Sequence, residues 1–328
     1  MKMKKSALFI FLALTLTLIL AACGNKEEAG GEGTDTVKIG FQKGNTLNIL
    51  KARGTLEERL KEENISVEWS EFPIGTALLE GLNTGRIDFG HASDANGVFS
   101  QASGKPSVYI ASDTPYPEGV ALVVKEDSPI ESIEDLKGKK VAVTKGGNMH
   151  YLLDTALEAN GLTIEDTEIV YYKDSAEGMT AFESGAVDVL GTWDPFLAVL
   201  ESKTKTRTIT NGENLTENRT FYFASQDYAD NHADILKIIL EELEKSDQWA
   251  NENSKEVAEI LSKELKIDSA PLKTAIERRT FGVLPIDEAA IKAQQDLADS
   301  FFKLGLFPEE IEIKDAVKES PDWYPEGI

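Results

Sequence analysis

A strand that ends in a glycine turn and opens a helix occurs twice in this chain, and this repeat constrains the fold more than any other feature. In the more telling copy, residues 140–144 are a β-branched run, Lys-Gly-Gly-Asn follows at 145–148, and residues 151–157 carry apolar side chains at helical spacing. The glycine pair allows a sharp turn and leaves the first amide N–H groups of the helix uncovered. Those amides, the helix dipole and the lysine predict a site for a small anion. Taken alone, the stretch also fits an ordinary strand–helix turn that contains glycine.

The second copy lies near the N-terminus. A strand is predicted at residues 37–42, Lys-Gly-Asn follows at 43–45, and a single helix is predicted through residues 47–60. Residues 82–89 and 182–189 then share one pattern, which is typical of a helix end, a glycine cap and a strand that begins with a β-branched residue and Asp. The repeated order predicts two βαβαβ lobes. Open parallel sheets bind ligands at the carboxyl ends of their strands, so two facing lobes would enclose a ligand in a cleft.

The N-terminal segment has the composition of a secretory signal. Three lysines precede an apolar run at residues 6–20, which is shorter than the ~20 residues that a membrane-spanning helix needs. Leu-Ala-Ala-Cys at residues 20–23 resembles the lipobox of bacterial lipoproteins, and therefore predicts a signal peptide at residues 1–22 and lipidation of Cys23. A diacylated cysteine supplies the two chains that stable anchoring takes. Residues 23–36 have no apolar period and are predicted to be a flexible tether.

Charge and cysteine content exclude several function classes. The formal net charge is −23, and removal of a signal peptide with its three lysines makes it −26. Such an acidic chain disfavours nucleic acid and anionic lipid head groups as partners. A single cysteine gives no disulfide framework and no cysteine-based metal site, and neither a metal nor a cofactor is predicted. An anionic ligand would need local hydrogen-bond donors to overcome the negative electrostatic potential of the chain, whereas a cationic ligand would be attracted by that potential. The sequence leaves the sign of the ligand's charge open.

Proline and glycine mark the crossings between the two predicted lobes. Residues 115–119 carry two prolines and a glycine and lead out of the first lobe, and a strand predicted at 220–224 leads back. The first lobe is assigned to residues 37–114 plus 220–328, and the second to residues 115–219. Two crossings are what a hinged clamshell requires. The chain is then predicted to be helical at residues 230–251, 254–265, 269–278 and 287–304.

Polar and aromatic residues follow the third strand of each predicted lobe. Ser93 and Asp94 are either N-caps of the next helix or cleft residues, because their position is the carboxyl end of a strand. Trp193 ends the corresponding strand, where a ligand-lining role and a buried core role are both open. Asp194 and Pro195 are predicted to be the N-cap and first residue of the following helix.

Two further positions carry alternatives. Arg278 and Arg279 are either a solvated surface pair, or one of them reaches the cleft mouth as a fork for an oxyanion. His150 is either a first-turn helix residue exposed to water or a hydrogen-bond donor to the ligand.

With these features together, the chain resembles the substrate-binding proteins of bacterial ABC importers, specifically the aliphatic-sulfonate, taurine and nitrate group. The resemblance runs from about residue 37 to residue 317. It implies an α/β two-lobe periplasmic-binding-protein fold of type II, with a double-crossover hinge and additional C-terminal helices. The matching motifs are Gly-Phe-Gln-Lys-Gly at 40–44, Glu-Phe-Pro-x-Gly at 71–75, Asp-Leu-Lys-Gly-Lys-Lys-Val-Ala at 135–142, Gly-Thr-Trp-Asp-Pro at 191–195, and Arg-Arg-Thr-Phe-Gly-Val-x-Pro-Ile at 278–286.

The resemblance also implies where the ligand is held. The family's ligand positions carry over onto Gln42, Ser93, Asp94, Gly147, Asn148, His150, Trp193, Asp194 and one of Arg278 and Arg279. Two stretches depart from the family's pattern. His-Ala-Ser-Asp at 91–94 stands where sulfonate binders often carry Ser-Thr-Gly-Asp, and Gly-Asn-Met at 147–149 stands where they carry serines. Both changes remove hydroxyl donors, and Met149 indicates a more apolar pocket.

The implied function is a non-catalytic, extracytoplasmic one. The chain would be a monomer, lipid-anchored at the outer face of the cell membrane, which passes a small sulfonate to an ABC permease and its ATPase. Taurine, nitrate or another small nitrogen or sulfur compound is the alternative, since Asp94 and Asp194 would suit an amine end. A cationic amine held by Trp193, Tyr116 or Trp69 is a third possibility. Three scattered histidines, no Gly-x-Ser-x-Gly and no phosphate P-loop argue against an enzyme.

Overall fold

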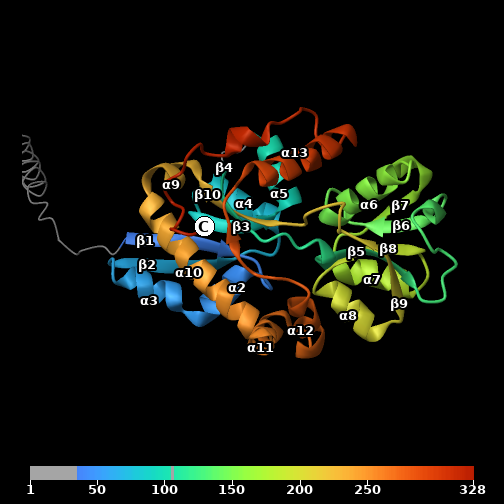
Figure 1. Cartoon of the computed structure of the whole chain (residues 1–328), viewed down its shortest axis with the longest axis horizontal. Coiled ribbons are helices and arrows are strands. Elements are labelled where there is room, and N and C mark those ends of the chain that lie inside the picture. Colours follow the sequence, from blue (N-terminus) through green and yellow to red (C-terminus); the bar gives the residue numbers. More distant parts are fainter. Residues whose placement is uncertain (1–34, 105–106) are drawn as a thin grey trace, which may run out of the picture. The chain divides into compact units, whose positions relative to one another are not determined.

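The computed structural model describes residues 35–104 and 107–328. The predicted signal peptide, Cys23 and most of the predicted tether lie outside the described residues. The first strand begins at Asp35, so the last two residues of the predicted tether belong to it. Thr36–Ile328 form one compact unit that contains two β-sheets (Figure 1). In the part of the chain that the structure describes, every helix is too short or too polar to cross a bilayer.

The first sheet mixes parallel and antiparallel strands in the order β11-β4-β10-β3-β1-β2. β1 and β3 are parallel, with Ile39 opposite Phe89, whereas β10 runs antiparallel to both of its neighbours, β3 and β4. The strand that returns from the second crossing therefore lies in the middle of the sheet. The strands are β1 (Asp35–Phe41), β2 (Ile65–Glu71), β3 (Phe89–Ser93), β4 (Ser107–Asp113), β10 (Thr220–Ser225) and β11 (Val283–Leu284).

The second sheet has the order β7-β6-β8-β5-β9. β6 is parallel to β7 and β8, as the repeat predicts, but β5 pairs antiparallel with β8 and β9, so a purely parallel lobe is wrong here. The division of the chain into lobes with the stated bounds stays a prediction. The strands are β5 (Val120–Lys125), β6 (Lys140–Val143), β7 (Glu168–Tyr171), β8 (Val189–Trp193) and β9 (Thr206–Asn211).

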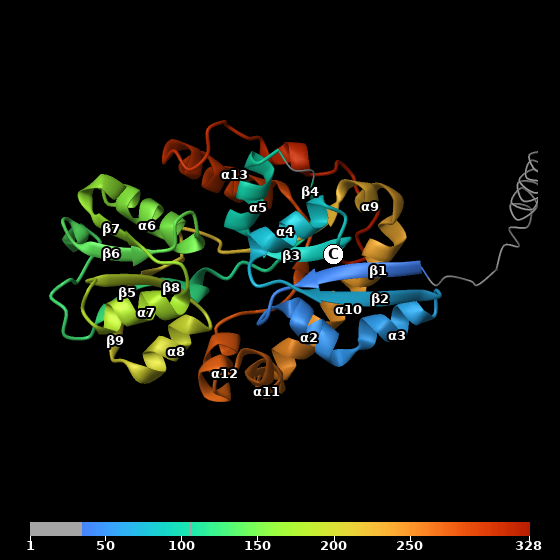
Figure 2. The ribbon, with the colours of Figure 1, turned by 180° about the vertical axis from the view of Figure 1, so that it is seen from behind.

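Helices cover both faces of the first sheet (Figures 1 and 2). α2, α3 and α10 pack on the face that carries Ile39, Ile110 and Tyr222, and α4 packs on the face that carries Tyr109 and Phe223. This alternation follows from the two-residue period of a strand. The helices are α2 (Thr46–Arg53), α3 (Thr55–Lys61), α4 (Gly75–Asn83), α5 (Asp94–Ala102), α6 (Asn148–Ala159), α7 (Ser175–Glu183), α8 (Phe196–Lys203), α9 (Gln226–Asn231), α10 (Ala233–Glu252), α11 (Ser254–Leu265), α12 (Ser269–Glu277) and α13 (Glu288–Lys303).

Three predicted helix boundaries are wrong. The helix expected through residues 47–60 is split at Gly54, whose φ of 71° ends α2 and precedes α3. The helix expected from residue 230 is split at His232, which is the C-cap of α9 and the N-cap of α10. The N-cap of α8 is Pro195 rather than Asp194, although the Asp194 carboxylate still accepts a hydrogen bond from the first turn, from the Ala198 N–H at 3.1 Å.

The sequence repeat is also a repeat of contacts. Asp88 Oδ2 accepts a hydrogen bond from the Lys38 N–H at 2.8 Å, and Asp188 Oδ2 accepts one from the Lys140 N–H at 2.9 Å. In each copy the N–H of the same aspartate donates to the carbonyl of the same lysine, at 2.7 Å and 2.9 Å respectively. The glycine–x–β-branched–Asp pattern therefore ties the residue before the third strand of each copy to the first strand, at Lys38 within β1 and at Lys140 at the start of β6.

Candidate functional site

The turn before α6 leaves helix donors without a cap. Gly147 is the N-cap and supplies no side-chain acceptor. The N–H groups of His150 and Tyr151 both donate to the Gly147 carbonyl, at 2.9 and 3.2 Å. Within the described chain, the N–H groups of Asn148 and Met149 have no acceptor. The positive end of the helix is therefore open to an anionic group.

Lys145 adds a positive charge to this turn. Its side chain is exposed and lies over the Tyr171 ring, with Nζ 5.8 Å from the ring centroid. No carboxylate of residues 35–104 or 107–328 forms an ion pair with it. An anion at the start of α6 would therefore meet an unneutralised cation.

The predicted ligand residue His150 is buried and supports the turn before α6, and its donation to a ligand stays a prediction. Its side chain is 1% exposed, and Nδ1 accepts a hydrogen bond from the Gly146 N–H at 3.1 Å. Nε2 is buried without a partner among the described residues, in a ring that packs on Tyr171 and Phe301. Burial, and then the charge of Lys145, lowers the pKa of His150 to about 4. The exposed first-turn role is wrong, and a neutral imidazole holds the glycine turn in shape.

At the first sheet, polar residues from three elements meet. Asn96 Nδ2 donates to Ser93 Oγ at 3.0 Å, and a Cβ placed on Gly75 would lie 2.5 Å from Asn96 Nδ2 and 3.3 Å from Gln42 Oε1. Ser93 is the N-cap of α5, as one alternative predicts. The Gln42 N–H donates to His91 Nε2 at 3.1 Å, and burial lowers the pKa of His91 to about 3. Gln42 and Ser93 thus lie close together at the carboxyl ends of β1 and β3.

Asp94 joins the start of α5 to the second crossing and to the α6 turn. Its side chain is buried; Oδ1 accepts from the Ala95 N–H at 2.7 Å and Oδ2 from the Arg219 N–H at 3.2 Å. The Asn148 side chain also interacts with it, and donates to Asn218 Oδ1 at 2.7 Å. Burial is the largest influence on Asp94 and raises its pKa to about 7. The predicted residues Asp94 and Asn148 are therefore brought together.

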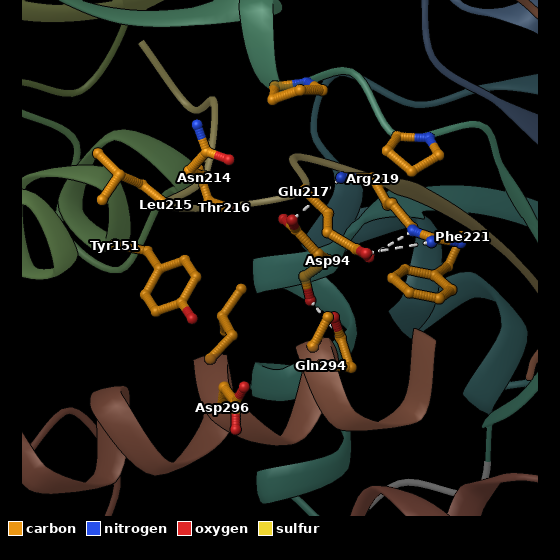
Figure 3. Close-up of a pocket in the computed structure, with 14 residues that line it drawn as sticks. Asp94, Tyr151, Asn214, Leu215, Thr216, Glu217, Arg219, Phe221, Gln294 and Asp296 are labelled. Carbon is orange, nitrogen blue, oxygen red and sulfur yellow. Dashed lines mark hydrogen bonds and ion pairs between the residues drawn. The ribbon is translucent and has the colours of Figure 1, made fainter. Parts of the chain in front are cut away.

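A cavity of about 330 Å³ adjoins this junction (Figure 3). Its walls come from both crossings, the start of α5, α6 and α13, and include Asp94, Tyr151, Arg219 and Gln294. Neither Tyr151 nor Arg219 was predicted as a site residue. Arg219 could have been found from its position in the sequence, because it directly precedes the strand that returns to the first sheet. Nothing in the local sequence indicates that Tyr151 lines a cavity.

Asp194 and Arg278 are bound to each other. Arg278 Nη1 donates to both carboxylate oxygens of Asp194, at 3.0 and 3.1 Å. Tyr116 donates its hydroxyl hydrogen to Asp194, and Arg278 also pairs with Glu201. The Asp194 side chain is 3% exposed. These contacts tie α12 to the segment between β8 and α8 and leave neither charge free for a ligand.

Arg279 and Trp193 are both held by packing contacts, and Trp193 packs against the cluster that contains Met149 of the α6 turn. Arg279 is paired with the buried Asp113 and stacks on Tyr116 and Phe281, with its guanidinium 5.0 and 4.4 Å from the ring centroids. Trp193 is half-buried and packs against hydrophobic residues on both sides of the second sheet. Trp193 therefore combines a core role with a partly open face at a strand end.

No group of three or more side chains suited to hold a metal ion occurs in residues 35–104 and 107–328. Two α/β sheets joined by two crossings, with open amides and a cavity at their junction, define the class of two-lobe ligand-binding proteins. Comparison with known proteins places the chain within this class. The model of the family described as NMT1/THI5 like matches residues 60–257, and the chain belongs to this family.

Relatives in sequence cover almost the whole chain. The chain is 31% identical to the putative aliphatic sulfonates-binding protein of Escherichia coli K12, over 90% of this chain and 91% of the relative. It is 28% identical to the protein of the same description from Bacillus subtilis 168, over 95% and 94%. This length of agreement places the whole described body within the family.

Solved structures agree. The crystal structure of the periplasmic aliphatic sulphonate binding protein SsuA from Escherichia coli superposes with a TM-score of 0.84 at 30% identity, over 90% of this chain and 94% of that one. The alkanesulfonate-binding protein SsuA from Xanthomonas axonopodis pv. citri, bound to MOPS, gives 0.77 at 30% identity, over 86% and 98%. The predicted periplasmic-binding-protein fold is confirmed.

Proposed function

We propose that this chain is the extracytoplasmic binding component of an ABC importer and that its cargo is a small aliphatic sulfonate. The observation that carries the proposal is the likeness, in both sequence and fold and over nine-tenths of the chain, to aliphatic sulfonate-binding proteins. The open start of α6 agrees with it, because a sulfonate offers three acceptor oxygens to a set of free donors.

The proposed sulfonate site combines the α6 turn with the polar group at the first sheet. The N–H groups of Asn148 and Met149, which have no acceptor in the described chain, would donate to the sulfonate, and Lys145 would add an opposite charge. Gln42 and Ser93 would donate from the other side, and Trp193 would contact the alkyl part. Gly147 is needed because a side chain there would cover the amides. Asp94 is left out, because a buried carboxylate repels an anion.

Asp194 and Arg278 are proposed to hold the two halves of the binding protein together, and Arg279, which pairs with Asp113 within the first predicted lobe, reaches the second through the Tyr116 ring. The Asp194–Arg278 pair joins residues 84 positions apart, one in each predicted lobe. Lobes at residues 37–114 plus 220–328 and at 115–219 would open when this contact breaks and close over bound ligand. The arginines would then set how readily the cleft opens, instead of touching the sulfonate.

The remaining parts of the proposal concern location and partners. Residues 1–22 would be cleaved as a signal peptide, and lipidated Cys23 would anchor the chain to the outer face of the cell membrane. The predicted tether would hold the folded part of the chain away from the membrane surface. A monomer would deliver its cargo to a membrane permease driven by an ATPase, and would carry out no chemistry on it.

Ligand-dependent unfolding tests the function. A ligand that binds only the folded chain stabilises it by RT ln(1 + [L]/Kd), which is about 2.7 kcal/mol at a hundred times the Kd. Ethanesulfonate is expected to raise the Tm saturably and to give one-to-one binding in calorimetry, and acetate at equal ionic strength is the control. If the Tm is insensitive to ethanesulfonate, taurine and nitrate alike, the proposed class of cargo is wrong.

A further inference from the structure

The cavity beside the crossings has the size and walls of a small-molecule site. Its volume of about 330 Å³ falls within the usual range for ligand pockets, about 300–1,000 Å³. Proline, leucine and phenylalanine side chains form the apolar part of the wall, and polar or charged side chains face the cavity from the start of α5, from α6 and α13, and from the second crossing (Figure 3). It would therefore hold a small molecule with an apolar part and one polar end.

Asp94 is the lining charge that lacks a counter-ion. Arg219 pairs with Glu217 at 2.5 Å, and Asp296 pairs with Lys292 at 2.5 Å. Asp94 is only 4% exposed and accepts hydrogen bonds from uncharged donors, and no ion pair reaches it within the described chain. Glu217 raises the pKa of Asp94 beyond the effect of burial. A buried carboxylate is costly unless a cation accompanies it, so the group that would complete this wall is positively charged.

Tyr151 supplies a second, independent observation. Its side chain is 7% exposed, and its hydroxyl points into the cavity from α6 (Figure 3). The hydroxyl has no hydrogen-bond partner in the described chain, although the ring is fixed by an edge contact with Phe301 at 6.1 Å between centroids. Burial raises the pKa of Tyr151, so the phenol stays neutral. The hydroxyl oxygen at the cavity wall can therefore accept a hydrogen bond from an N–H donor.

We propose that this cavity is a second ligand site, which binds a small primary alkylammonium ion. The ammonium is paired with the Asp94 carboxylate and donates a further hydrogen bond to the Tyr151 hydroxyl. The alkyl chain packs on Leu215, Phe221 and Leu297. An ammonium has three N–H donors and no acceptor, which matches a wall that offers acceptors. The site adjoins the proposed sulfonate site, because the Asn148 side chain interacts with Asp94, but it uses different groups: the Asp94 carboxylate and the Tyr151 hydroxyl instead of the α6 amides.

Calorimetric titration of the full chain with n-propylammonium chloride tests the inference, with potassium chloride as the ionic control. We expect saturable one-to-one binding, which persists when the chain is first saturated with n-propanesulfonate. Tyr151→Phe keeps the ring and removes the hydroxyl, so it should weaken propylammonium binding about tenfold and leave propanesulfonate binding unchanged. Asp94→Asn should abolish propylammonium binding.

Asp299→Asn is the matched control. It removes a carboxylate from α13, as exposed as Asp296 but outside the cavity, and should leave both affinities unchanged. Three results would overturn the inference: no saturable binding of propylammonium, equal weakening by Asp299→Asn and Asp94→Asn, or unchanged affinity in Tyr151→Phe. Competition between the two ligands would also overturn it, because the two sites would then be one.

The conservative Tyr151→Phe variant keeps the test decisive should Asp94→Asn fail to fold. The two proposals also fail separately. Propylammonium binding without any sulfonate binding supports the second site and contradicts the proposed cargo, and the reverse result contradicts the second site alone.

Discussion

The turns that open α2 and α6 share one backbone arrangement but differ in their helix caps. In each, the N–H of a glycine donates to a side chain four residues further on: Gly44 to Asn48 Oδ1 at 2.7 Å, and Gly146 to His150 Nδ1 at 3.1 Å. The shared bond fixes the same backbone path in both. What differs is the residue that caps the helix.

In the first turn the side chain of the N-cap residue accepts a hydrogen bond from a free N–H group of the helix, and in the second turn it does not. Asn45 Oδ1 accepts from the Thr46 N–H at 2.6 Å, whereas Gly147 has no side chain to do so. The lysines differ in the same sense, because Lys43 pairs with Glu71 at 3.1 Å and Lys145 pairs with no carboxylate of the described chain. One copy of the turn therefore satisfies a helix donor, and the other leaves its donors open, as the proposed sulfonate site requires.

The largest expected effect comes from giving the second turn the cap of the first. In Gly147→Asn the new side chain would accept from the Asn148 N–H and occupy the place of the sulfonate. Hydrogen bonds to a charged group contribute about 1.5–3 kcal/mol each, so the loss of two should weaken ethanesulfonate binding about a thousandfold. Isothermal titration calorimetry measures this directly.

Gly147→Asn must be combined with a second substitution that removes a steric clash. A Cβ on Gly147 would lie 2.1 Å from Thr144 Oγ1. Thr144→Ala removes that oxygen, and the single variant should bind ethanesulfonate like the parent chain. Undiminished binding in Thr144→Ala/Gly147→Asn would show that the α6 amides do not hold the anion.

A second difference between the turns concerns the side chain that accepts from the glycine N–H: His150 in the second turn can be protonated, whereas Asn48 in the first cannot. Because the pKa of folded His150 is about 4 against an ordinary 6.5, the unfolded chain takes up a proton in this interval and the folded chain does not. Stability is therefore lost as pH falls from 6.5 towards 4, by up to about 3 kcal/mol from this group. His150→Asn copies the acceptor of the first turn and should remove that part of the acid sensitivity.

Urea unfolding at pH 7 and pH 4.5 measures it. His91, whose pKa is also lowered, contributes equally to parent and variant, so the difference between them reports His150 alone. The reciprocal variant Asn48→His should add acid sensitivity to the first turn. An unchanged pH slope in His150→Asn would mean that the imidazole is not held neutral in the fold.

Local pattern was enough to predict both turns, most strands and the repeated aspartates. Each of these features depends on residues close in sequence: a β-branched run, a glycine, and an apolar period. The sequence repeat did not predict the Asp88–Lys38 and Asp188–Lys140 contacts, which the structure shows at equivalent places in the two copies. The family resemblance rests on the same local motifs, and it was correct for the fold.

Contacts between distant segments could not be predicted in this way. Asp194 and Arg278 look like free ligand groups in the sequence, but they neutralise each other across 84 positions. The cavity depends on α13, which brings Gln294 within hydrogen-bond distance of the Asp94 carbonyl, 200 residues away in the chain. For His150 the sequence left exposure open, because one of its ring contacts, Phe301, comes from the distant α13. Only tertiary packing decides such cases.

A smaller effect distinguishes the two repeated aspartates. The Asp88 contact is partly buried and burial raises the Asp88 pKa, whereas the Asp188 contact is exposed. Removing a hydrogen-bond acceptor leaves the donor unsatisfied only where water cannot reach it. Asp88→Ala should therefore lower the free energy of unfolding by about 2 kcal/mol, and Asp188→Ala by about 0.5 kcal/mol.

Chemical denaturation of the two variants gives both values. Asp88→Asn keeps an acceptor oxygen and should recover most of the loss. Equal losses in the two alanine variants would mean that the two contacts contribute equally to the free energy of unfolding, whatever their burial.

The smallest expected effect is that of uncapping the first turn. Asn45→Gly gives α2 the same N-cap residue as α6, and a glycine N-cap costs only a few tenths of a kcal/mol relative to asparagine. A newly freed amide would not create a second sulfonate site, because Thr46 is 0% exposed, its hydroxyl is bonded to Tyr222, and the charge of Lys43 is taken by Glu71. Calorimetry should find the parent stoichiometry of one sulfonate per chain. A stoichiometry of two would mean that the cap residue alone decides whether a turn binds a sulfonate. In that case neither an exposed amide nor an unpaired lysine would be required for binding.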